Sequence, residues 1–185
     1  MNDAVKNAAS KYGPIIAGIG IAYTLVAYLL NMELMVNMWA GISLWIINFV
    51  LLIISVRAAK QAMGGFISFK NAFGTFILTF VISSLLTTVF AIVLFNVVDT
   101  EAAEELQELT IETTVSFMEK LGTPESEIEK QVANLEETNQ FSLGSQVKGF
   151  FMGIVFYAIL GLIVAAVMKK DKPQFEYQPE DTDNA

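Results

Sequence analysis

Glutamates spaced four apart between positions 99 and 147 are the residues of this sequence best placed for chemistry. Such spacing brings two carboxylates together on one helix face, where they can bridge a divalent cation or share acid–base work. A hard-cation site needs more converging oxygens than one face supplies, and no nucleophile, phosphate-binding loop or cofactor motif accompanies the carboxylates. We therefore expect no enzyme activity, metal or cofactor, and instead a solvated partner surface formed by Glu101, Glu104, Glu105, Glu108 and Glu112.

Hydroxyl and amide side chains within two long apolar runs form a second group. Its members are Asn48, Thr79, Ser83, Ser84, Thr87 and Thr88. One interpretation is the lining of a polar pathway through a membrane; the other is hydrogen bonding between helices or back to helix carbonyls. We favour the second, because no Asp, Glu, Lys, Arg or His lies inside the expected spans, whereas coupled transporters usually carry such a group at the midplane.

Small residues recur four apart in two apolar runs, a spacing that lets helix backbones approach closely in a membrane. The pairs are Gly18 with Ala22, Gly149 with Gly153, and Gly161 with Ala165. We interpret them as packing contacts within one helical bundle. The alternative is a face between two copies of the chain in a homodimer.

The composition excludes several classes of protein. The 185 residues are 54% hydrophobic and 16% charged, and a charged fraction well below the roughly 25% of soluble domains indicates a membrane protein. The absence of cysteine excludes disulfides and thiolate sites, and the absence of histidine removes the commonest general base and metal ligand. A net charge of −8 offers no basic face, so we expect no nucleic-acid partner.

Four apolar runs are long enough to be membrane helices, and the third organises the chain. About 20 helical residues cross the hydrocarbon core, and residues 69–98 exceed that length without a charge after Lys70. Pro14 suits the first turn of the first helix, and the run that follows is long for a signal peptide, so we expect an uncleaved span. The expected spans are residues 14–30, 39–56 and 69–98, all within residues 1–98, and then 146–169.

Residues 99–145 form an acidic insert with twelve carboxylates against two lysines. Asp99 or Thr100 can cap a first helix, and Thr123-Pro124-Glu125 starts a second. Apolar side chains at spacings of three and four predict that the two helices pack on each other as a hairpin. The expected seam between them consists of Leu106, Leu109, Ile128, Val132 and Leu135.

Basic residues predict the orientation, because lysine and arginine near span ends stay on the cytoplasmic side. They cluster before the first span, between the second and third, and after the fourth: Lys6, Lys11, Arg57, Lys60, Lys70, Lys169, Lys170 and Lys172. We therefore expect a multi-pass protein of a bacterial inner membrane, with both termini cytoplasmic and the hairpin outside. Residues 170–185 read as a disordered cytoplasmic tail.

Three short motifs carry a family resemblance: Lys11-Tyr12-Gly13, the stretch of residues 64–74 (GGFISFKNAFG), and Val98-Asp99. With them the chain resembles a group of bacterial membrane proteins of unknown function, common among Bacteroidetes, over nearly its whole length. The resemblance implies four spans with a helical insert between the third and fourth. It implies no activity and no catalytic residue.

The sequence thus predicts an all-α integral membrane protein that lies in the lipid bilayer. Two hypotheses for its function are compatible with this prediction. The leading hypothesis is a structural or interaction accessory that presents the acidic hairpin to another membrane or periplasmic protein. The alternative is a small transporter or channel subunit with a hydroxyl-lined third helix. A water-accessible row along Thr79, Ser83, Ser84 and Thr87 favours the alternative, and tight closure of that row favours the accessory.

Overall fold

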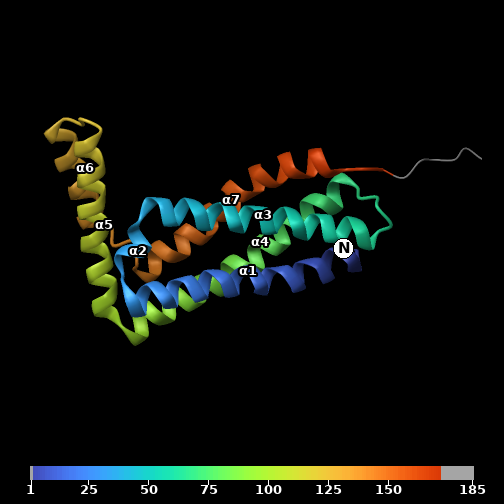
Figure 1. Cartoon of the computed structure of the whole chain (residues 1–185), viewed down its shortest axis with the longest axis horizontal. Coiled ribbons are helices and arrows are strands. Elements are labelled where there is room, and N and C mark those ends of the chain that lie inside the picture. The colour runs from blue at the N-terminus through green and yellow to red at the C-terminus, as the bar shows by residue number, and fades with distance from the viewer. Residues whose placement is uncertain (1, 172–185) are drawn as a thin grey trace, which may run out of the picture.

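A computed structural model describes residues 2–171 of the chain, so most of the predicted tail lies outside the described residues. Within that range the protein is helical, as predicted, with seven α-helices and one π-helical segment (Figure 1). Four helices are long and apolar enough to cross a membrane, which confirms the predicted fold class of four spans. They are α1 (Asp3–Leu30), α3 (Met38–Ala62), α4 (Phe69–Val93) with the π-helical segment η1 (Leu94–Val98), and α7 (Leu143–Met168).

Helix α1 begins eleven residues before the position that Pro14 suggested, at Asp3 instead of Pro14. Asn2 caps it by accepting a hydrogen bond from the backbone N–H of Ala4 at 3.0 Å. The extra turns form because Val5 and Ala9 are fully buried against the bundle, so helix formation there buries apolar surface. Pro14 therefore lies inside the helix, where it leaves one carbonyl without its usual helical partner.

The remaining helices occupy the connections and the insert. A short helix α2 (Glu33–Val36) follows α1, and α3 continues to Ala62 because Ala59 is still buried in the bundle. After α4 and η1, the insert folds as α5 (Thr100–Lys120) and α6 (Glu125–Glu137). Helix α7 starts at Leu143, where the Ser142 hydroxyl accepts from the Ser145 N–H at 3.3 Å.

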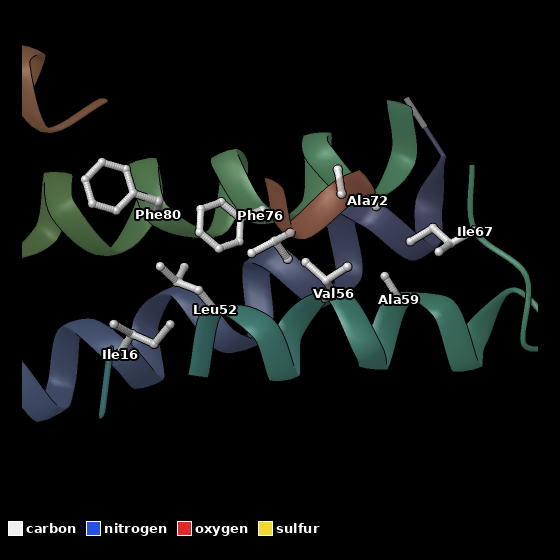
Figure 2. Packing of buried hydrophobic residues seen from close by; sticks show 11 residues of the cluster. Ile16, Leu52, Val56, Ala59, Ile67, Ala72, Phe76 and Phe80 are labelled. Atoms are coloured by element: carbon white, nitrogen blue, oxygen red, sulfur yellow. The ribbon is translucent and has the colours of Figure 1, made fainter. Parts of the chain in front are cut away.

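Helix α4 is the central helix of the bundle and packs against α1, α3 and α7. The buried side chains of Phe76 and Phe80 on α4 belong to one cluster with Leu52 of α3 and Ile16 of α1 (Figure 2). Tyr157 of α7 stacks on Phe80, with the two ring centroids 4.0 Å apart. The core is therefore built around the segment that the sequence singles out as the longest span.

The two ends of the bundle differ. At one end lie the start of α1, the α3–α4 link and the end of α7 (Figure 1). There Ile67 and Lys170 exchange backbone hydrogen bonds of 2.9 and 2.8 Å, and the Lys60 ammonium donates to the carbonyl of Met168 at 2.8 Å. At the other end, α5 and α6 cross over the bundle (Figure 1). The insert is thus a cap on one end of the bundle.

Candidate functional site

Asp99 fastens the start of α5 to α1. One carboxylate oxygen accepts from the Ala102 N–H at 2.9 Å, which caps the helix, and the other accepts from the Tyr28 hydroxyl at 2.6 Å. The hydrogen bond from Tyr28, and then that from Ala102, hold the pKa of the Asp99 carboxyl below its ordinary value. The backbone N–H of Asp99 also closes the π-helical turn on the carbonyl of Leu94 at 2.8 Å. One residue therefore ends the third span and starts the insert.

The face of α5 that carries Leu106 and Leu109 packs on the bundle, which corrects the assignment of these two residues to the hairpin seam, whereas the α6 members of the predicted seam lie on the side towards α5. Leu106 is fully buried, in a cluster with Leu94 and Phe95 at the end of the third span. Leu109 lies beside Trp39 and Phe117 in a groove between α5 and the start of α3. Residues three and four apart share one helix face, so Leu106 and Leu109, which face η1, α2 and the start of α3, cannot also form the contact with α6.

Polar side chains hold α6 and the following link next to α5. The Gln107 amide donates to the carbonyl of Leu135, and its oxygen accepts from the Gln140 N–H at 3.2 Å. The Asn96 amide donates to the carbonyl of Phe141 at 3.0 Å. These contacts lie near the C-terminal end of α6, so the hairpin is tied at its base and open towards its tip.

An open groove of about 600 Å³ runs between α5 and α6 over that tip. Its apolar residues come from both helices, and its charged residues are all glutamates. The groove is lined by Val115, Glu119, Thr123, Glu125, Ile128, Glu129, Val132, Ala133 and Glu136. An apolar surface flanked by four carboxylates, with no lysine or arginine among the lining residues, can receive a segment that is apolar on one side and basic on the other.

The five predicted surface glutamates lie outside this groove. Glu101 and Glu105 flank a shallow pocket with Tyr28 and Asp99 at the α5 start. Glu112 lies in the groove towards α3, while Glu104 and Glu108 are exposed. Among the described residues no three acidic side chains converge as a metal site would require. The sequence-based prediction did not include the glutamates that line the α5–α6 groove, because it selected glutamates with i,i+4 spacing near the start of α5.

The hydroxyls of the third span bond mainly within their own helix. Thr79 is fully buried, donates to the carbonyl of Thr75 at 2.7 Å and lies 3.1 Å from the hydroxyl of Ser55 in α3. Ser83 donates to the carbonyl of Phe80 at 2.9 Å. Two contributors, Thr75 and Ser55, have no sequence signal beyond being small polar residues in apolar runs.

Further along α4 the hydroxyls reach a small cavity. Ser83, Ser84 and Thr87 line it together with Asn48 of α3, and its volume is about 120 Å³. The Asn48 side-chain oxygen is buried and accepts no hydrogen bond within the described part of the chain. Thr88, the last of the predicted polar residues, is half-buried and does not line this cavity. The predicted row is therefore divided into a closed part at Thr79 and a hollow part at Ser84 and Thr87.

The predicted small-residue pairs divide between packed and exposed positions. Gly161 is buried, and a Cβ there would lie 2.9 Å from the Phe76 ring, so α7 approaches α4 only because this residue is glycine. Ala165 is fully buried, and a Cβ at Gly153 would lie 3.4 Å from Phe80. Three residues, by contrast, are exposed: Gly18, Ala22 and Gly149. For these the homodimer alternative stays a prediction.

One close approach went unpredicted. A Cβ at Gly13 of α1 would lie 2.8 Å from the Cβ of Ile82 in α4, so the two helices touch there. Ala9 and Ala17 lie four positions before and after Gly13, so the small-residue spacing is present here too, but it was not among the predicted pairs. Ala9 and Ala17 are in fact buried as well, and the three residues form the α1 contact face.

The fold and the hairpin define a class: a multi-pass helical membrane protein with an acidic helical insert docked on one end of its bundle. Residues 11–170 match the family described as Protein of unknown function (DUF4199), and the chain belongs to that family. This confirms the predicted resemblance to a family of unknown function. Comparisons with curated proteins and with solved structures give no significant match.

Proposed function

We propose that the protein is a non-enzymatic interaction accessory of a bacterial inner membrane. In this proposal the α5–α6 hairpin lies outside the membrane and binds another membrane or periplasmic protein. The observation that carries the proposal is the α5–α6 groove, with its apolar floor and its four lining glutamates. The bundle supports it by fixing the base of the hairpin through Asp99 and Leu106.

The distribution of basic residues supports the outward orientation. The start of α1, the α3–α4 link and the end of α7 lie at one end of the bundle, and the hairpin lies at the opposite end (Figure 1). Lys6, Lys60 and Lys169 lie in or next to these three segments. Lysine and arginine near span ends are retained in the cytoplasm. The hairpin end is then periplasmic, and its glutamates face a compartment in which a partner protein can reach them.

The groove suggests the chemistry of the partner. Val115, Ile128 and Val132 offer apolar contact to a helix laid along the hairpin, as in recognition of amphipathic helices by hydrophobic grooves. Glu129 and Glu136 offer carboxylates to lysine or arginine on the edges of that helix. The partner is therefore a cationic amphipathic helical segment.

The test uses the full-length protein in nanodiscs of zwitterionic lipid and a labelled amphipathic peptide of leucine and lysine. Fluorescence anisotropy measures the Kd. We expect Glu129→Gln with Glu136→Gln to weaken binding by roughly tenfold, since lost exposed charge contacts contribute up to about 1 kcal/mol each and 1.4 kcal/mol is a factor of ten.

The matched control removes two carboxylates from exposed positions outside the groove, by Glu104→Gln with Glu108→Gln. Charges beyond about 8 Å are largely screened at physiological ionic strength, so this variant should stay within about twofold of wild type. If both variants weaken peptide binding equally, the peptide responds only to the net charge of the protein. That result, or the absence of binding, contradicts the proposed groove.

The transporter alternative has less support. Its polar row is interrupted where Thr79 is fully buried and hydrogen-bonded to Ser55 and to its own helix. Phe76 and Phe80, on the same helix, are also buried there (Figure 2). The row is thus closed at Thr79, although not along its whole length, and this interruption favours the accessory.

A further inference from the structure

The cavity of about 120 Å³ lies among four membrane helices, away from the hairpin. Asn48 of α3, Ser83, Ser84 and Thr87 of α4 and Tyr157 of α7 give it polar lining, and α1 contributes Ile16. Figure 2 shows Ile16, Leu52 and Phe80, three of its apolar lining residues, extending from α1, α3 and α4 towards the same region. A polar hollow in the middle of an apolar bundle needs an occupant, because unsatisfied polar groups are costly where no bulk water is present.

Three side-chain oxygens of the lining residues can accept hydrogen bonds for which no donor is present within residues 2–171. The Ser83 hydroxyl already donates to the carbonyl of Phe80, and the Thr87 hydroxyl donates to the carbonyls of Ser83 and Ser84. A hydroxyl has one hydrogen and two lone pairs, so these two oxygens can only accept further hydrogen bonds. The Asn48 oxygen is buried and likewise has no donor among the described residues.

We propose that this cavity is a binding site for water, with a small cluster of molecules donating hydrogen bonds to Asn48, Ser83 and Thr87. Its volume suffices for more than one water molecule, and buried waters typically make about three hydrogen bonds to otherwise unsatisfied groups. A metal or ammonium ion fits less well, since no carboxylate is present among the lining residues to balance its charge. This inference is independent of the proposed function.

The site is a hydrated pocket rather than part of a conduit. On the side nearer the α4 start, Thr79 has no exposed surface and is satisfied by Thr75 and Ser55, so it offers nothing to a continuing chain of water. The water cluster therefore donates hydrogen bonds to Asn48 and to the hydroxyls that follow Thr79 along α4. Thr79 is also an internal control, because it is a buried hydroxyl of the same helix outside the cavity.

The test is water-edited solid-state NMR of the full-length protein in deuterated lipid bilayers. We expect polarisation to pass from water to the Asn48 amide and to Thr87, and much less to Thr79. Asn48→Leu fills the cavity and removes its acceptor, and it should reduce the transfer to Thr87 severalfold. If Asn48→Leu does not fold, the difference in polarisation transfer between Thr87 and Thr79 in the wild-type protein still tests the proposal.

Three outcomes overturn the proposal. Absence of transfer to Asn48 and Thr87 means that the cavity is dry. Equal transfer to Thr79 and Thr87 means that water runs along the whole row, as in a pathway. A change in the chemical shifts of Asn48 and Thr87 when sodium or ammonium chloride is added, but not when potassium chloride is added, means that the occupant is a cation.

Discussion

Asp99 shows how much of the arrangement depends on a single carboxylate. It caps α5 through Ala102 and binds Tyr28 of α1, so the same group ends one element, starts the next and ties both to the bundle. Both hydrogen bonds favour the ionised form, which is why the pKa of the Asp99 carboxyl lies below its ordinary value. The attachment of the hairpin to the membrane helices should therefore depend on pH.

The sign of that dependence follows from the lowered pKa. Stabilisation by Asp99 is fully present above the ordinary aspartate pKa of about 3.9 and is lost as the pH falls through the lower pKa of the folded state. Hydrogen exchange followed by NMR should show the protection of the Ala102 amide falling severalfold in this acidic range. The variant Asp99→Asn keeps a capping oxygen but cannot titrate, so its protection should change little. If the variant loses protection with the same midpoint, the glutamates and not Asp99 control docking.

Single polar residues could be located from the sequence, but their partners could not. Asn48 was placed in the middle of a span from the apolar run around it, which is a local property. That Ser83 and Thr87 would meet it in a cavity depends on the rotation of two helices packed side by side. Tyr28 and Asp99 are 71 residues apart, and no local pattern links them.

At the scale of helices, the spacing of apolar residues predicts which face is buried but not what covers it. The stripe with Leu106 and Leu109 was correctly read as an apolar face of α5, yet that face lies against the bundle. A contact with α6 was equally compatible with the sequence, because both surfaces are apolar. The choice is made at Asp99, where the backbone leaves the helical conformation after η1 and α5 turns across the end of the bundle (Figure 1).

The small residues of α7 give a direct test of helix packing. Gly153 faces Phe80 of α4, whereas a Cβ at Gly149, four residues earlier, would meet no atom within 4 Å. Gly153→Leu should lower the free energy of unfolding by about 1–3 kcal/mol, the usual cost of overpacking. The matched change Gly149→Leu should stay within about 0.5 kcal/mol of wild type, as surface substitutions do.

Thermal unfolding in mild detergent measures both variants under identical conditions. Equal melting temperatures for wild type and Gly153→Leu would mean that Phe80 moves aside freely or that α7 turns another face to α4. Destabilisation by Gly149→Leu alone would reverse the assignment of the packed and exposed faces. Either result contradicts the α4–α7 interface described here.

For the whole molecule, the number of membrane-spanning helices followed from composition and run length, whereas the short helix α2 was not predicted. Four helices of 28, 25, 30 and 26 residues are long and apolar enough to cross a membrane, and this property requires no knowledge of tertiary structure. The start of α1 could not be predicted, because Val5 and Ala9 are buried by the packing of α1 in the bundle, where Val5 lies close to Gly74 of α4. The groove glutamates were missed for the same reason, since only the hairpin brings α5 and α6 residues together.

In the proposed orientation, the hairpin lies on the opposite side of the membrane from both termini, where a partner can reach its groove. Reporter fusions in a bacterial host test it most directly. Green fluorescent protein after Ala185 should fluoresce, since it folds in the cytoplasm, and alkaline phosphatase inserted at Thr123, in the turn between α5 and α6, should be active outside. An active phosphatase after Ala185, with fluorescence from the fusion at Thr123, would place the hairpin in the cytoplasm and contradict the account.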